Sequence, residues 1–349
     1  MVIIFAILLF CLLIVVHEFG HFIAAKLCRV QVNEFSIFMG PAIFQWGKGE
    51  TKYSIRCIPI GGYCSMEGED EETDNPRAFT RAKWWKRLII LVAGSAMNFL
   101  VGLILVFIVL SPAQRFVTTD VVQVESGSSL AEGNGILPGD CILNIGGEEL
   151  YTQSDFSLIL AVKGGGRHDV TVVRSGERIV LDDVLFEARS FGDEETPRFG
   201  ITFDTTEATL GQRLKYTWYS ALDYVRMVRL SLSMLLTGQA GIQDMAGPVG
   251  IVDQMAQTTQ AAANATDAMF RLLDFGALIA INLAVMNMLP IPALDGGRVL
   301  LLLITTLVQK VTKKKLDPKY EGYIHAAGMI LLLGFMAVVT LKDIFGLFN

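Results

Sequence analysis

The first apolar stretch of the chain contains three polar residues that could do chemistry, within the segment His17-Glu18-Phe19-Gly20-His21. Strongly polar side chains at the depth of a bilayer are costly, by roughly 2.5 to 3.5 kcal/mol each for the worst ones on insertion scales. On a helix, residues four apart lie on one face, so His17 and His21 can point at one metal ion. Glu18 lies one step around the helix, within reach of a water molecule beside that ion.

This spacing is the H-E-x-x-H pattern of zinc hydrolases. A catalytic zinc site holds three protein ligands and leaves a fourth position for water, so a third ligand must come from elsewhere. Two histidines remain, His168 and His325, and neither is well placed in the sequence. Asp295 is the better candidate, because an acid inside an apolar stretch is a functional candidate by default and a cation is the natural partner of a buried carboxylate.

A structural role is the competing interpretation of Asp295, since Arg298 follows three residues later and could form a salt bridge with it. If zinc is instead held by His17, His21 and Asp295, Glu18 is the base that takes the proton of the attacking water and passes it to the leaving amine. The substrate would then be a membrane-embedded segment that is locally unwound, because a helix hides its carbonyl groups in hydrogen bonds.

The apolar stretch that carries Asp295 is interrupted by prolines and glycines at positions 290, 292, 296 and 297. Non-helical backbone at membrane depth is tolerated only where it lines a cavity in the protein. Asn287 precedes this break, and its amide could bind the backbone of a substrate. Strand-like segments within residues 30–60 could pair with an extended substrate by strand addition.

The composition is that of an integral membrane protein. Of the 349 residues, 52% are hydrophobic and 18% are charged, against about 25% charged in an average soluble protein, and the mean hydropathy is +0.47. The net charge of −6 gives no support to nucleic-acid binding. The five cysteines have no C-x-x-C spacing, which predicts neither a disulfide framework nor a cysteine zinc site. No basic residue precedes the first apolar run, so we expect no cleaved signal peptide.

The apolar stretches predict a polytopic α-helical membrane protein with about four transmembrane helices, each near the 20 residues that a span requires. The predicted spans are residues 1–27 with the zinc motif, 88–110, 271–308 with the broken Asp-bearing segment, and 324–345.

Three further segments separate the spans. Residues 28–87 predict a membrane-associated β-hairpin loop, and residues 117–205 predict an inserted α+β domain of short strands and turns. Residues 206–270 are expected to form amphipathic helices on the membrane surface or against the spans.

Lysine and arginine predict the orientation. The basic loops 26–87 and 310–319 follow the first and third spans and therefore lie on one side of the membrane. By the positive-inside rule that side is cytoplasmic. The zinc motif is then expected toward the cytoplasmic side of the bilayer, and the domain at 117–205 is expected to be extracytoplasmic.

The zinc motif together with Asn287-Met288-Leu289-Pro290-Ile291-Pro292-Ala293-Leu294-Asp295-Gly296-Gly297 resembles the site-2 protease family, most closely its bacterial branch of regulator-of-sigma-E proteases. The resemblance covers nearly the whole chain, including Gly61-Gly62-Tyr63 and Met97-Asn98-Phe99. It implies a zinc intramembrane endopeptidase with His17, His21 and Asp295 as Zn²⁺ ligands and Glu18 as base. It also implies that Asn282 and Asn287 engage the substrate, and we expect Pro290 and Pro292 to bind it with them.

The segment Gly135-Ile136-Leu137-Pro138-Gly139-Asp140 resembles part of a PDZ domain. One copy is present, as in the single-PDZ members of the branch. The resemblance implies that this domain restricts access or binds a peptide C-terminus. Phe38 is a departure, since the family often has glycine at this position of the hairpin.

We therefore expect a multi-pass enzyme of the cell inner (plasma) membrane that cleaves transmembrane segments of single-pass proteins. Anti-sigma factors and signal-peptide remnants are candidate substrates in regulated intramembrane proteolysis. Its expected partners are these substrates, the lipid bilayer and a peptide C-terminus, with no nucleic acid. Two alternatives stay open. One is a non-proteolytic PDZ-bearing membrane scaffold with a structural metal. The other is a transporter that uses His17, Glu18 and Asp295 as a cation relay, although the sequence shows no inverted repeat to support it.

Overall fold

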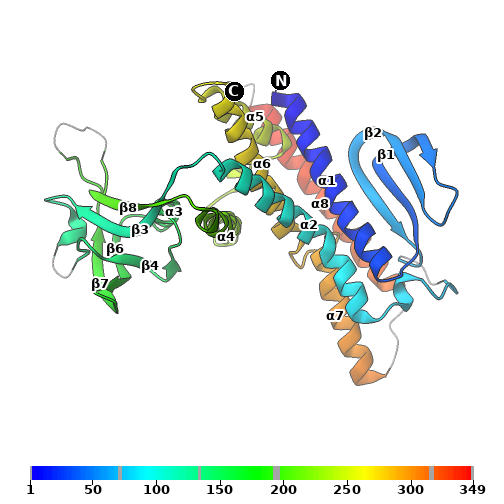
Figure 1. Ribbon diagram of the computed structural model, residues 1–349. Helices are drawn as coiled ribbons and strands as arrows, with labels where there is room; N and C mark the ends of the chain where they lie inside the picture. The colour runs from blue at the N-terminus through cyan, green and yellow to red at the C-terminus, as the bar shows by residue number, and fades with distance from the viewer. Residues whose placement is uncertain (1, 70–72, 133–134, 192–196, 314–317, 347–349) are drawn as a thin grey trace. The chain divides into compact units, whose positions relative to one another are not determined.

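The computed structural model describes residues 2–69, 73–132, 135–191, 197–313 and 318–346 (Figure 1). The chain forms two compact units, each of which is described by itself. Unit 1 comprises residues 1–105 and 231–349, and unit 2 comprises residues 106–230.

Unit 1 is built mainly from helices. They are α1 (Val2–Leu27), α2 (Trp84–Leu110), α5 (Pro248–Gln260), α6 (Ala265–Asn287), α7 (Asp295–Thr312) and α8 (Pro318–Gly346). Within the described residues, four helices are long and apolar enough to cross a membrane: α1, α2, α6 and the part of α8 from Gly322 to Gly346. The expectation of a polytopic membrane protein with four spans is confirmed.

Small residues let these helices approach closely. A Cβ atom on Gly20 of α1 would lie 2.4 Å from the carbonyl oxygen of Ala93 in α2, and one on Gly102 of α2 would lie 2.5 Å from Ile281 of α6. Such small-residue contacts are the usual way in which membrane helices pack. They bring α1, α2 and α6 together, and α1 carries the zinc motif.

A curled β-hairpin lies against α1, formed by β1 (Val32–Trp46) and β2 (Lys52–Met66). The first half of β1 pairs along both of its edges, so that Ser36 lies opposite both Ser54 and Tyr63. Phe38 has a φ of 70°, a conformation that glycine adopts without strain. Phe38 is therefore a strained position, and the resemblance leads us to expect a glycine here.

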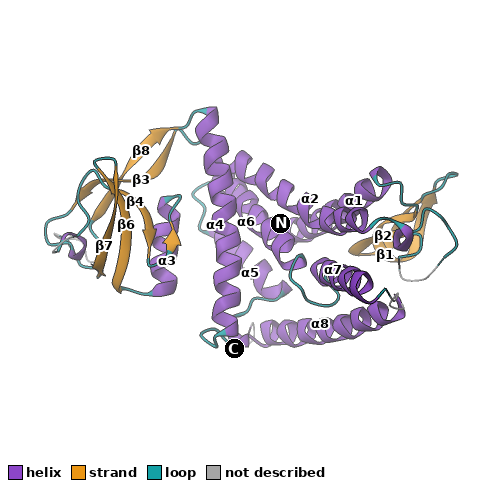
Figure 2. Cartoon of the chain, turned by 90° about the horizontal axis from the view of Figure 1, so that it is seen from below, coloured by secondary structure: helices purple, strands orange, loops and turns teal. Residues whose placement is uncertain are grey.

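Unit 2 contains a six-stranded sheet with strand order β7-β6-β4-β3-β8, and β5 pairs with β4 (Figure 2). The strands are β3 (Arg115–Val124), β4 (Cys141–Ile145), β5 (Glu148–Glu149), β6 (Gly166–Arg174), β7 (Glu177–Phe186) and β8 (Ile201–Glu207). Helix α3 (Gln153–Lys163) contributes Phe156, Ile159 and Leu160 to a core shared with the sheet. Short 3-10 turns occur at Phe79–Arg81, Ser129–Ala131 and Ile242–Asp244.

Helix α4 (Leu210–Leu236) buries part of its polar side. Asp223 and Arg226 are 8% and 7% exposed, whereas the apolar residues Leu210, Leu214 and Trp218 are 66%, 57% and 48% exposed. Arg226 donates to the backbone oxygen of Glu149 and to Asp155. The part of this helix within unit 2 therefore buries Asp223 and Arg226 alongside Tyr216, Ala221 and Val228, and leaves Leu210, Leu214 and Trp218 largely exposed.

Candidate active site

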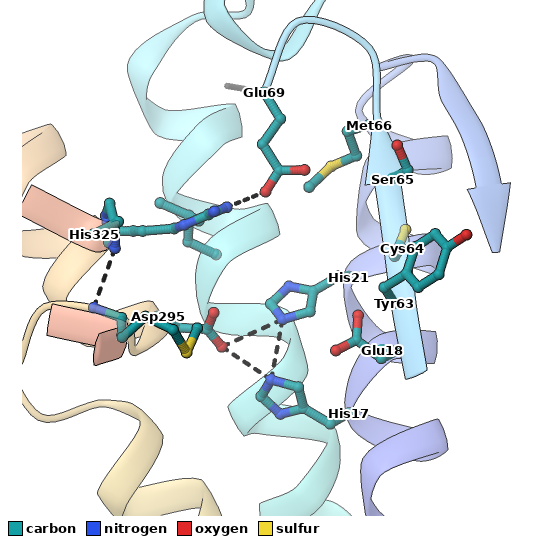
Figure 3. A pocket seen from close by; sticks show the side chains of 14 residues that line it. His17, Glu18, His21, Tyr63, Cys64, Ser65, Met66, Glu69, Asp295 and His325 are labelled. Carbon is teal, nitrogen blue, oxygen red and sulfur yellow. Dashed lines mark hydrogen bonds and ion pairs between the residues drawn. The ribbon is translucent and has the colours of Figure 1, made fainter. Parts of the chain in front are cut away.

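His17, His21 and Asp295 meet in unit 1, although almost 280 residues separate the first from the last. Among the described residues they are the one group of three whose ligand atoms lie within 4.8 Å of one another. The two histidine Nε2 atoms are 3.2 Å apart, and Asp295 Oδ2 lies 3.1 Å from that of His17 and 3.3 Å from that of His21 (Figure 3). The three side chains are only 12%, 9% and 18% exposed.

Local sequence explains how each ligand is presented. The two histidines lie one turn apart on one face of α1. Asp295 is the first residue of α7, directly after the break that follows α6. A Cβ atom on Gly296 or Gly297 would lie 2.2 or 2.3 Å from a carbonyl oxygen of that break, so the turn can fold over the start of α7 only because both residues lack side chains.

The competing interpretation of Asp295 as a partner of Arg298 is not supported. Arg298 instead pairs with Glu69, in the turn after β2. The carboxylate of Asp295 faces the histidines.

Hydrogen bonds orient both imidazoles. His21 Nδ1 lies 2.8 Å from the carbonyl oxygen of Ile90 in α2. Because a carbonyl only accepts, this places the ring proton on Nδ1 and turns the lone pair of Nε2 toward the cluster, which is the usual arrangement of a metal-binding histidine. The amide of Asn98, also in α2, lies 3.5 Å from His17 Nδ1. Asn98 therefore joins α2 to α1 and lies beside the site.

The three residues fit a zinc ion. Ligand atoms at about 2.0–2.1 Å from a tetrahedral zinc are separated by roughly 3.3–3.4 Å, close to the separations observed. Asp295 Oδ2 is buried and makes no hydrogen bond of acceptable geometry, although both imidazole nitrogens are close to it. A buried carboxylate oxygen without a proton donor needs a cation. A Cβ atom on Gly94 would lie 2.4 Å from His21 Nε2, so α2 leaves room for the cluster.

These ligands open into a cavity of about 460 Å³. Glu18 lines it, with its carboxylate beside the two imidazoles (Figure 3). One wall is the end of β2, and the opposite wall comes from α7 and α8. The remaining polar and sulfur-bearing lining residues are Tyr63, Cys64, Ser65, Met66, Glu69, Arg298, His325 and Met329.

The predicted substrate-binding residues are close in sequence to Asp295, but they do not line the cavity. Asn282 and Asn287 are in the last part of α6 and Pro290 and Pro292 are in the break, and none of the four is among the described residues that line the cavity. The sequence analysis did not point to Cys64, Ser65, Met66 or Glu69 as site residues, and it considered Arg298 only as a salt-bridge partner of Asp295. His325 was considered only as a third ligand. It lines the cavity without belonging to the ligand cluster.

Comparisons with known proteins agree on one family. The profile of "Peptidase family M50" matches residues 5–335. A Clostridium perfringens protein, provisionally named a zinc metalloprotease, is 36% identical over 348 residues, covering 99% of this chain and 98% of its own. The zinc metalloprotease RasP of Oceanobacillus iheyensis is 28% identical, with 98% of both chains covered. The regulator of sigma-W protease RasP of Bacillus subtilis is 26% identical, again over 98% of both chains.

Proposed function

The chain belongs to peptidase family M50, the site-2 protease family, and from this premise we propose that it cleaves transmembrane segments of single-pass membrane proteins in regulated intramembrane proteolysis. It is a metalloprotease with Zn²⁺ as cofactor. Anti-sigma factors and signal-peptide remnants are the proposed substrates.

One observation carries this proposal. His17, His21 and Asp295 converge within 4.8 Å, inside a cavity that Glu18 also lines. The histidines and Glu18 belong to a helix long and apolar enough to cross a membrane. A hydrolytic site at such a position can reach the part of a substrate that lies in the bilayer, which a water-soluble protease cannot.

In the proposed mechanism His17, His21 and Asp295 hold the zinc ion. The bound ion would polarise the substrate carbonyl and make water acidic enough to lose a proton near neutral pH. Glu18 takes that proton and delivers it to the nitrogen of the leaving amine. The hydrogen bonds of His21 to Ile90 and of His17 to Asn98 keep both rings turned toward the site. The imidazoles therefore do not have to reorient during the reaction.

The substrate strand is proposed to add to the end of β2. Tyr63, Cys64, Ser65 and Met66 line the cavity, and in the described residues this stretch pairs on one side only, with β1. An extended substrate can pair with such an open edge through its own main chain. This assigns strand addition to residues 63–66, which lie just beyond the 30–60 range predicted from the sequence. Asn282, Asn287, Pro290 and Pro292 are proposed to contact the substrate as it enters.

Unit 2 is proposed to be a PDZ-like domain on the extracytoplasmic side of the inner membrane, with the catalytic site toward the cytoplasmic side. The PDZ-like segment forms a turn in which Asp140 accepts a hydrogen bond from the amide of Leu137 and pairs with Arg174. The lysine and arginine distribution supports the orientation. The domain would limit access by size or bind a newly made C-terminus.

The direct test replaces Glu18 with glutamine. The Glu18→Gln variant should keep its zinc, measured by mass spectrometry of the purified protein, and should lose about 10²- to 10⁴-fold in cleavage of a single-pass test substrate. A Glu177→Gln variant, which removes a charge from an exposed strand end in unit 2, is the control and should cleave normally. Cleavage by Glu18→Gln at the wild-type rate would refute the proposed mechanism, and a scaffold function would be indicated if the wild type itself cleaved no membrane segment.

A further inference from the structure

His325 is a polar residue in α8 whose role the zinc ligands and the base do not explain. It lies in the part of α8 that is apolar enough to cross a membrane, where a polar ring needs a specific partner. It lines the same cavity as the ligands but is not one of the clustered residues.

His325 contacts the turn that carries Asp295. The backbone N–H of Ala293 donates to His325 Nδ1 at 3.2 Å (Figure 3). Ala293 has a φ of 80°, a left-handed conformation that is strained for any residue with a Cβ atom. Strain of this kind persists only where the surroundings hold it. Ala293 is two residues before Asp295, so the hydrogen bond acts on the backbone that aims the carboxylate.

A second contact from α8 supports the same turn. A Cβ atom on Gly328, three residues after His325 and on the same side of the helix, would lie 2.4 Å from Pro292 Cβ. Helix α8 therefore presses directly on the turn at Pro292 and bonds it at Ala293. From within the turn itself, Gly296 fits against the backbone of Met288 and Leu289.

We propose that His325 is a positioning residue for Asp295, an inference that rests on the proposed zinc site. Its Nδ1 accepts the N–H of Ala293 and holds the turn in the one conformation that brings the Asp295 carboxylate to His17 and His21. An imidazole that accepts through Nδ1 is neutral and carries its proton on Nε2. Helix α8 thus completes the metal site without contributing a ligand.

Positions along α8 should therefore differ in their effect on zinc binding. His325 and Gly328 hold the turn, whereas Gly334, six residues further along α8, has no atom within 4 Å of the place where a Cβ would stand. Substitutions at the first two should weaken zinc binding, and Gly334→Ala should not.

The test measures the zinc dissociation constant of the full-length protein in detergent by competition with a chelator. His325→Ala should weaken zinc binding about 10- to 100-fold, the loss usual when an outer partner of a metal ligand is removed, and should lower kcat more than KM. His325→Asn keeps an acceptor oxygen close to the position of Nδ1 and should restore most of the affinity. His168→Ala, a histidine variant in unit 2, should bind zinc as the wild type does.

Two results would overturn the inference: a wild-type zinc dissociation constant in His325→Ala, or His325→Asn binding zinc as weakly as His325→Ala while its metal-free form unfolds at the wild-type temperature. Because the readout is metal affinity, it decides the role of His325 even if the Glu18→Gln experiment shows that the site does not hydrolyse peptides. A protein that binds no zinc in the wild type would instead refute the proposed function itself.

Discussion

The two units of this protein both bury carboxylates, and they treat them in opposite ways. In unit 2 Asp140 and Asp155 have no exposed surface, and each is paired with an arginine. In unit 1 Asp295 faces two histidines, and its Oδ2 atom makes no hydrogen bond. A buried charge needs a partner in both places. The chain supplies one to these two carboxylates of unit 2, as it does to Asp343 of unit 1 through Lys342, but not to Asp295.

Asp140 and Asp155 of unit 2 both have their charge and their hydrogen-bonding capacity satisfied. Asp140 receives two bonds from Arg174 and one from the amide of Leu137. Asp155 caps α3 by accepting from the amide of Thr152 at 2.8 Å and pairs with Arg226 at 2.5 Å. These groups fix turns and helix starts, and no lone pair is turned to an empty space. Their role is structural.

The carboxylate of unit 1 is left for an ion. The lone pairs of His17, His21 and Asp295 converge, and the outward sides of the two rings are occupied by Ile90 and Asn98. The comparison gives a criterion for this chain: buried charges that are balanced within the protein stabilise the fold, whereas buried acceptors that converge without a donor indicate a metal site. Four substitutions test whether the two kinds of burial can be separated.

Arg226→Ala should damage unit 2 and spare the metal site. It leaves Asp155 buried without its cation, which costs about 3–5 kcal/mol when one partner of a buried pair is removed. Hydrogen exchange should show this loss as faster exchange of the amides of α3 and β5, with zinc content unchanged. Arg229→Ala is the matched control, because Arg229 is 57% exposed and pairs with Glu148 at the surface, where a pair contributes less than about 1 kcal/mol. Equal effects of the two substitutions would contradict the structural role of the buried pair.

Asp295→Ala should have the reverse effect. Four-ligand zinc sites bind with about 10–16 kcal/mol, so one ligand represents on the order of 3 kcal/mol, or roughly a hundredfold in zinc affinity. The variant should lose zinc and cleavage, and exchange in unit 2 should stay as in the wild type. The metal-free variant should be no less stable than the metal-free wild type, because the substitution removes an unsatisfied buried acceptor. Undiminished zinc content would exclude Asp295 from the ligand set.

The clustering of the three proposed ligands could be predicted from the sequence, for two different reasons. The spacing of His17 and His21 is a local property, since any helix places residues four apart on one face. Asp295 was predicted from the free-energy cost of placing a carboxylate in an apolar stretch, which implies a functional partner. Neither argument needs to know how the helices are packed.

The surroundings of the ligands could not be predicted in the same way. Asn98 beside His17, Glu69 beside Arg298 and His325 beside Ala293 are pairs from distant parts of the chain, and they depend on the rotation of each helix about its axis. The burial of helix α4 could not be predicted from the sequence either. Its apolar period predicts a helix and an apolar face, but the period cannot show that Asp223 and Arg226 on the other side are buried.

Gly94→Ala tests the room that α2 leaves for the metal ligands. The added Cβ atom would lie 2.4 Å from His21 Nε2 and 2.8 Å from His17 Cε1, so the imidazoles or the helix must move. Displaced ligands should weaken zinc binding about 10- to 100-fold, as other disturbances around metal ligands do, while the protein still inserts and folds. Gly334→Ala is the control in a span with open space. Wild-type zinc affinity in Gly94→Ala would show that the cluster tolerates a shift of α2.

Among the described residues of unit 2, Asp223 is the buried carboxylate that resembles Asp295, since its Oδ1 atom has no hydrogen-bond partner. Burial, followed by a hydrogen bond to Asp155 and repulsion from its charge, raises the pKa of Asp223 to about 7, against the opposing attraction of Arg226. The folded state thus binds this proton more tightly than the unfolded state, in which an aspartate has a pKa of about 3.9.

The stability that protonated Asp223 contributes is therefore complete below about pH 4 and is lost as the pH rises through about 7. Asp223→Asn keeps a donor toward Asp155 at every pH. Measured by hydrogen exchange of α3 amides with the intrinsic rates corrected, the variant should match the wild type at about pH 4 and be the more stable protein at pH 8. Parallel stability curves for the two proteins would mean that Asp223 has the same pKa in the folded and unfolded states. A difference that grows as the pH rises would show that unit 2 satisfies the Asp223 carboxylate with a proton, where we propose that unit 1 uses a metal.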